Sequence, residues 1–147
     1  MAINTSKVVV SGVVAGIVSN VLGFLLFGLW LAPRFNSEIE AAAPGLAARA
    51  ETGGAMAWTI IGGFVVGFVL AWLYAAIRPR FGPGAKTAIY AGLVVWVLGF
   101  IFHIDMLILG LSSMNTYMMA SVAALVQVLG TAWVAGMLYK EDATATI

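Results

Sequence analysis

The sequence has no cysteine, a single histidine and few charged side chains. Without cysteine, the chain can form neither a disulfide framework nor a thiolate metal centre nor a cysteine nucleophile. Charged residues make up 9% of the 147 residues, against roughly a quarter in an ordinary soluble domain. Hydrophobic residues make up 63%, which is more than a water-soluble particle of this size could cover with polar groups. This composition predicts a membrane protein, and a net charge of +1 argues against nucleic-acid binding.

Four long apolar stretches follow one another along the chain, at residues 8–32, 55–77, 87–111 and 114–139. Each is longer than the roughly 20 residues that cross a ~30 Å hydrocarbon core as a helix. The short alternating runs that mark membrane β-strands are absent. The sequence therefore predicts an all-α integral membrane protein. We expect a single domain over residues 1–147, with four transmembrane helices in an up-down bundle.

The lysine and arginine residues indicate the orientation of this bundle, because these residues favour the cytoplasmic side of the helix ends. Five would share one side with both termini, namely Lys7, Arg78, Arg80, Lys86 and Lys140, while two, Arg34 and Arg49, would lie on the other. Tyr74, Tyr90 and Tyr139 lie near the helix ends on the first side, as residues of an interfacial aromatic belt would. We predict a plasma (inner) membrane protein with both termini in the cytoplasm.

The first outer connection, residues 33–54, is long enough to contain structure of its own. Ser37 and Glu40 have the spacing of a capping box, in which a serine begins a helix and a glutamate three residues later bonds back to it. Pro44 and Gly45 would end such a helix after about two turns. The sequence predicts a short surface helix in this loop. A partner-docking element is the alternative interpretation.

Small residues mark the predicted contact faces of the helices, because apolar side chains do not drive helices together in lipid. Gly12 and Gly16 in the first stretch have the spacing of a close helix crossing. The second stretch carries a small residue at every fourth position, namely Ala55, Thr59, Gly63, Gly67, Ala71 and Ala75. The fourth stretch has a similar face. We expect these three helices to pack closely.

Asn20 and Gln127 are amides within apolar stretches. Counted from the inner ends of their helices, both lie about 18 Å into the membrane. Each also lies on the small-residue face of its helix. We predict a hydrogen bond between the two side chains, worth ~0.6–2 kcal/mol. The alternative is that they line a pathway for a solute.

His103 is one of two residues of acid, base or histidine type inside the third stretch, and such residues are candidates for function. It shares a helical face with Gly92, Trp96, Gly99 and Met106. A histidine there could be an axial ligand to haem or chlorophyll, or a proton-relay group. We expect instead a hydrogen-bonded histidine at a helix contact near the outer surface, with no cofactor bound and no metal.

Asp105 is the second of these residues, and on a continuous helix it points about 200° away from His103. The two therefore cannot form a pair there. Asp105 lies toward the side of Val94, Leu98 and Ile101, which would otherwise face lipid. One interpretation is that it reaches the outer headgroups or caps a break before Met106. The other is that it contacts a cation on another protein.

Motifs of catalysis are missing from the sequence, which has no phosphate-binding glycine loop, no HExxH zinc motif and no serine nucleophile elbow. We therefore expect no enzyme. Adhesive helix faces and few polar groups predict an accessory or assembly subunit of a larger membrane complex. A homo-oligomeric transporter or channel for a small solute or ion is the alternative. The expected partners are the lipid bilayer and other membrane protein subunits or copies of the chain itself.

Overall fold

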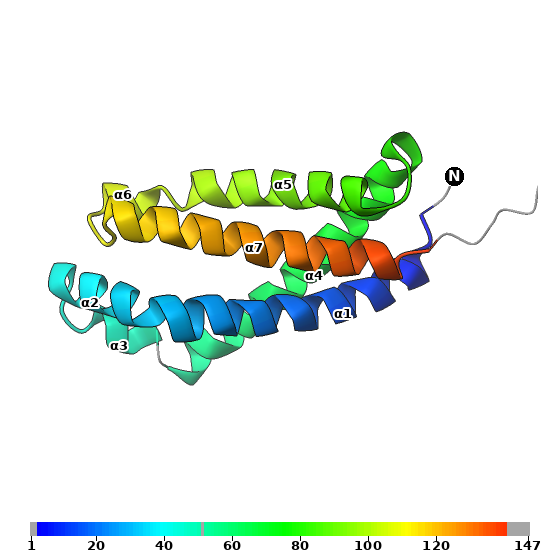
Figure 1. The fold of residues 1–147 in the computed structure, drawn as a ribbon. Coiled ribbons are helices and arrows are strands. Elements are labelled where there is room, and N and C mark those ends of the chain that lie inside the picture. The colour runs from blue at the N-terminus through cyan, green and yellow to red at the C-terminus, as the bar shows by residue number, and fades with distance from the viewer. Residues whose placement is uncertain (1–2, 51, 141–147) are drawn as a thin grey trace, which may run out of the picture.

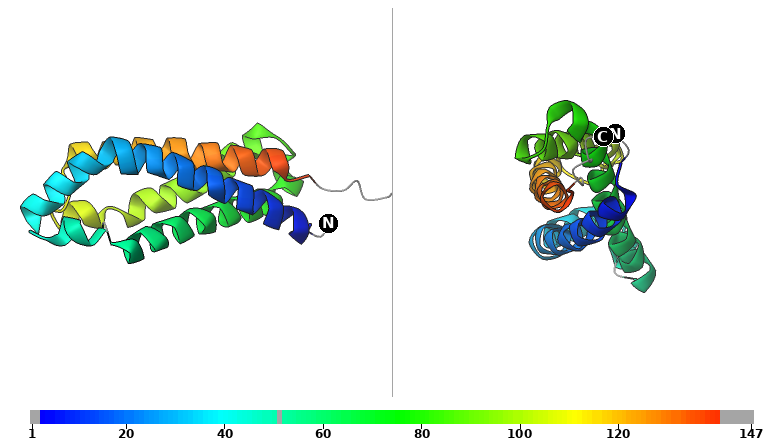
Figure 2. Two further views of the ribbon diagram at one scale, coloured as in Figure 1. Left: turned by 90° about the horizontal axis from the view of Figure 1, so that it is seen from below. Right: turned by 90° about the vertical axis from the view of Figure 1, so that its right-hand side faces the viewer.

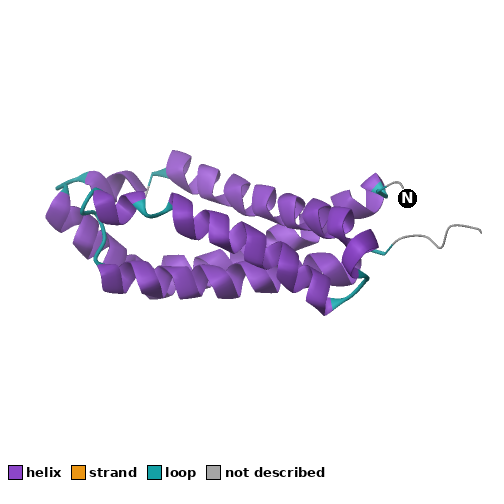
Figure 3. Ribbon diagram, turned by 90° about the horizontal axis from the view of Figure 1, so that it is seen from above, coloured by secondary structure: helices purple, strands orange, loops and turns teal. Residues whose placement is uncertain are grey.

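A computed structural model describes residues 3–50 and 52–140 of the chain. Over these residues the chain is helical, without a strand, and its connections are short (Figure 3). The elements are α1 (Thr5–Gly23), the π-helix η1 (Phe24–Leu31), α2 (Ala32–Ala42), α3 (Leu46–Ala50), α4 (Gly53–Phe81), α5 (Ala85–Phe102), α6 (Asp105–Ile108) and α7 (Met114–Leu138). Four helical stretches are long and apolar enough to cross a membrane, namely Thr5–Ala42, Gly53–Phe81, Ala85–Ile108 and Met114–Leu138.

The first of these helices is longer than the predicted stretch, because α1, η1 and α2 run on without a gap over 38 residues. At 1.5 Å per residue this is about 57 Å, nearly twice a ~30 Å hydrocarbon core. Pro33 does not end the helix, and it lies just after the junction where η1 passes into α2. Ser37 lies inside α2 and donates to the carbonyl of Arg34 at 2.9 Å, so the predicted capping box is not formed.

The third long helix is interrupted before the end of its predicted stretch. α5 ends at Phe102, and residues 103–113 form a connection that contains the short helix α6. This connection is longer than residues 82–84, which join α4 to α5. Gly110, with φ +67°, adopts the left-handed conformation that the reversal requires. The amides of Leu111 and Ser112 then both donate to the carbonyl of Met106, at 2.9 and 3.1 Å.

The long helices are arranged as two pairs. α1 packs along α4, α5 packs along α7, and contact between α1 and α7 joins the pairs (Figures 1 and 2). The N-terminus and the last turn of α7 lie at one end of the molecule, which we call the terminus end. α2, α3 and α6 lie at the opposite end, which we call the α2 end (Figure 1).

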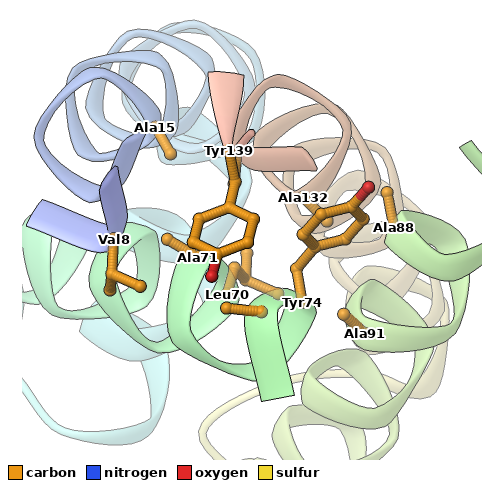
Figure 4. Packing of buried hydrophobic residues seen from close by; sticks show 11 residues of the cluster. Val8, Ala15, Leu70, Ala71, Tyr74, Ala88, Ala91, Ala132 and Tyr139 are labelled. Carbon is orange, nitrogen blue, oxygen red and sulfur yellow. The ribbon is translucent and has the colours of Figure 1, made fainter. Parts of the chain in front are cut away.

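A compact core lies at the terminus end, around Tyr74 and Tyr139 (Figure 4). Their ring centroids are 6.1 Å apart in an edge-to-face arrangement, and both residues are at most 2% exposed. The hydroxyl of Tyr74 accepts from the amide of Gly84 at 3.0 Å, and that of Tyr139 from the amide of Asn4 at 3.2 Å. These tyrosines are therefore core residues that hold four chain segments together, and they do not belong to the predicted aromatic belt.

The tightest helix crossing joins α1 and α4 at two glycines, Gly16 and Gly67. A methyl group on Gly67 would lie 2.6 Å from the Cα atom of Gly16 and 2.8 Å from the carbonyl oxygen of Gly12. The backbones therefore touch directly, as the small-residue spacing predicts. Toward the α2 end the α4 face leaves this contact, and Thr59 is exposed.

Candidate functional site

The candidate site is a cavity of about 450 Å³ between α5, α7 and the first long helix. It extends from the middle of the bundle, at Gln127, to the α2 end, at His103 and Ser112. Small-molecule sites in proteins have volumes of ~300–1,000 Å³. Its lining contains five aromatic residues and no lysine, arginine, aspartate or glutamate. The aromatic residues are Phe27, Phe35, Trp96, Phe100 and Tyr117.

Small side chains on α7 leave room for the cavity, and aromatic side chains hold its wall. Ala120 and Ala124, one turn apart on the face of α7 that lines it, fill little of the space toward α5. The Trp96 indole donates to the carbonyl of Ser121 at 2.8 Å, and the Tyr117 hydroxyl donates to the carbonyl of Phe100. These two bonds tie α5 to α7 along one side of the cavity.

The π-helix η1 brings the first long helix onto the other side of the cavity. Gly23 lies against Gln127, Phe27 and Phe35 line the cavity, and Leu31 between them is fully buried. Together with Ser19, these residues follow one another at every fourth position. On an ordinary α-helix, residues four apart do not stay on one face, and after four such steps the side-chain direction would have rotated by about 160°. In η1 each hydrogen bond spans five residues, which widens the turn and takes up this drift.

Asn20 and Gln127 do not bond to one another, contrary to the predicted pair. The Asn20 amide donates to the carbonyls of Gly16, at 2.9 Å, and Ile60, at 3.2 Å. The Gln127 amide donates to the carbonyl of Ser19, at 2.9 Å, and to its hydroxyl, at 3.3 Å. The two side chains lie at the same level of the bundle, but Asn20 fastens α1 to α4 and Gln127 fastens α1 to α7.

Because these contacts share no partner, the costs of removing them should add. We expect the losses of unfolding free energy in Asn20→Leu and Gln127→Leu to sum in the double variant to within about 0.5 kcal/mol. Reversible unfolding of all four proteins in mixed detergent micelles measures this. If the double variant loses much less free energy than the sum, the predicted direct hydrogen bond between Asn20 and Gln127 would be supported. Each single change would then leave the other amide unpaired.

His103 lies at the break between α5 and α6, where it is exposed and borders the cavity at the α2 end. Its Nδ1 atom is 3.0 Å from the carbonyl of Gly99. A carbonyl can only accept, so Nδ1 carries the proton in the neutral ring and Nε2 keeps a free lone pair. In the described part of the chain, no three histidine, cysteine, aspartate or glutamate residues lie close enough together to hold a metal ion.

Asp105 is the first residue of α6, so the helix break separates it from α5. Its side chain is exposed. The sequence pattern placed Asp105 on the same helix side as three residues of α5. These residues, Val94, Leu98 and Ile101, are 50–55% exposed. A carboxylate therefore lies beyond one end of an uncovered apolar helix face.

Glu38 on α2 accepts more hydrogen bonds than any other described carboxylate, a role that the sequence pattern did not predict. It accepts from the Ser113 amide at 2.8 Å and from the hydroxyls of Ser112, Ser113 and Thr116 at 3.2, 2.7 and 2.6 Å. These groups form the N-terminus of α7, where the helix dipole also favours a negative charge. Glu38 therefore fastens α2 to α7 beside the cavity.

No family model matches the chain, and no curated protein or solved structure is similar to it. Function is therefore inferred from the cavity, the helix faces and the polar groups described above.

Proposed function

We propose that this protein is an accessory or assembly subunit of a larger membrane complex and not an enzyme. The observation that carries the proposal is the poor coverage of α5 by the rest of the chain. Within its most apolar segment, 11% of the residues are buried, against 28–33% in the other three long helices. A helix that its own chain covers so little has a whole face available to another protein.

Asp105 supports a protein rather than lipid as the neighbour of this face. Apolar side chains such as Leu98 are equally satisfied by acyl chains and by another helix. A carboxylate is better satisfied by a cation, although at the end of α5 its burial in lipid costs less than the ~2.5–3.5 kcal/mol of the membrane centre. A lysine or arginine on a partner helix would pair with Asp105 while apolar residues cover α5.

The proposed setting is the plasma membrane, which the chain crosses four times as an up-down bundle with both termini in the cytoplasm. The alternating course of the four long helices in Figure 1 supports this arrangement. The excess of cations on the side of the termini supports the orientation. α3 would then be a short surface helix on the outer side.

Cysteine labelling tests the orientation cleanly because the chain has no cysteine of its own. We expect an impermeant thiol reagent applied to intact cells to label Ser37→Cys on α2 and to leave Ala85→Cys at the start of α5 unlabelled. Both positions are exposed, so both should react once the membrane is permeabilised. Labelling of Ala85→Cys alone in intact cells would reverse the orientation.

Site-specific cross-linking tests the docking face. A photoreactive phenylalanine analogue at Leu98 should form a stoichiometric cross-link to an unrelated membrane protein. The same analogue at Val10, an exposed position on α1, serves as the matched control and should not. Asp105→Lys should reduce the co-purified partner by at least about tenfold, because like charges would meet, whereas Asp105→Glu should retain it.

Two results would overturn the proposal. Equal cross-linking from Leu98 and Val10 would show that α5 has no preferred neighbour. Purification in mild detergent as a homo-oligomer that conducts ions or solutes in liposomes would favour the alternative, a transporter or channel.

A further inference from the structure

The cavity contains a hydroxyl group without a partner. Ser121 is 8% exposed and lines the cavity from α7. Its carbonyl accepts from Trp96, and no hydrogen bond joins its Oγ atom to a described residue. This hydroxyl is therefore a polar point on the wall of the cavity.

Gln127 adds a second polar atom, and this atom can only accept. Its Nε2 atom is fixed as the donor, because it bonds to the carbonyl of Ser19. The remaining Oε1 atom receives no hydrogen bond from the described residues. Gln127 lines the cavity about 9 Å further along α7 than Ser121. Its unused acceptor therefore calls for a ligand that donates a hydrogen bond.

The rest of the lining defines the body of that ligand. No lysine, arginine, aspartate or glutamate lines the cavity to compensate a charged group inside it. Phe27, Trp96 and Phe100 present apolar ring surface between the middle of the bundle and the α2 end. The volume of about 450 Å³ fits a small molecule or one chain of a larger one.

We propose that this cavity binds a neutral, membrane-dissolved alcohol or phenol. Its hydroxyl donates to Oε1 of Gln127, and its apolar body lies along the aromatic wall toward Ser121. This inference is independent of the docking proposal, because the outward face of α5 takes no part in it.

Trp96 reports on occupancy, because it is the tryptophan that lines the cavity. The other four, Trp30, Trp58, Trp72 and Trp133, are 51–75% exposed and can be replaced by phenylalanine. The single-tryptophan protein, in phosphatidylcholine vesicles, is titrated with a bromine-terminated octanol, whose bromine quenches nearby indole fluorescence. The methyl ether of the same compound is the matched probe, since it keeps the oxygen but cannot donate. A protein that retains Trp133 alone controls for quenching from the bilayer.

We expect saturable quenching of Trp96 by the alcohol and about fivefold weaker binding of the ether, the effect of one hydrogen bond. Gln127→Leu should abolish this preference, whereas Ser121→Ala, about 9 Å away along α7, should retain it. Ala124→Leu, which fills the cavity without removing a polar group, should abolish saturation. Trp133 should be quenched equally and without saturation by both probes.

Different results overturn the proposal. Linear, equal quenching of Trp96 by both probes would mean that the cavity takes up any apolar chain, including the phospholipid of the vesicle. An alcohol preference that survives in Gln127→Leu would refute the assigned hydrogen bond. Because Gln127→Leu also loses the bond to Ser19, circular dichroism and gel filtration of each variant verify the fold. Ser121→Ala and Ala124→Leu test the site without touching that bond.

Discussion

Gly67→Ala should destabilise the protein more than any other single added methyl group on α4. The new carbon would meet the Cα atom of Gly16 at 2.6 Å and the carbonyl oxygen of Gly12 at 2.8 Å. Both are backbone atoms, so relief requires α1 and α4 to move apart along their whole contact. Overpacking typically costs ~1–3 kcal/mol, and we expect a loss of about 3 kcal/mol or more here. Reversible unfolding in mixed detergent micelles measures the change.

Gly62→Ala is the matched control, because it makes the same change on the same helix where no atom lies within 4 Å. Alanine favours a helix over glycine by up to about 1 kcal/mol, so this variant should be neutral or slightly more stable. The difference between the two variants isolates the helix crossing from the propensity of the residue. Similar unfolding free energies for both variants would mean that α1 and α4 do not cross at Gly67.

The long helices could be predicted from the sequence because they depend on local patterns. Apolar length indicated four spans, and the predicted start of the fourth at residue 114 is where α7 begins. The small-residue spacing predicted close packing of three helices, and the structure shows the contact of α1 with α4 at Gly16 and Gly67. The predicted end of the first stretch at residue 32 was wrong, because the helix continues through Pro33 into α2.

The site could not be predicted because it depends on the rotation of each helix about its own axis. Counting residues gives the depth of Asn20 and Gln127, and both do lie at the level of Ser19. Depth does not say which neighbour a side chain faces, and the two amides face different helices. The π-helix η1 changes this rotation again for Phe35 and Glu38. A widened turn of this kind has no marker in the composition of the segment Phe24–Leu31.

Replacing Glu38 should have the second large effect, because its partners lie 74–78 residues away along the chain. Glu38→Ala would remove the acceptor of four hydrogen bonds and the negative charge at the N-terminus of α7. Hydrogen bonds to charged groups contribute ~1.5–3 kcal/mol, and they are not additive in one cluster. We therefore expect a loss of about 2–4 kcal/mol in unfolding free energy. Amide hydrogen exchange at Ser113 should accelerate, since its N–H loses its acceptor.

Glu40→Ala is the control, since Glu40 is exposed on the same helix and accepts from the amide of Gly45 alone, at 2.9 and 3.0 Å. We expect a loss of no more than about 1 kcal/mol and unchanged exchange at Ser113.

Glu38→Gln separates charge from hydrogen bonding, because its amide keeps one acceptor oxygen while the charge is lost. The unfolding free energy of Glu38→Gln should fall between those of Glu38→Ala and the native protein. If Glu38→Ala costs no more unfolding free energy than Glu40→Ala, the carboxylate does not hold α2 against α7.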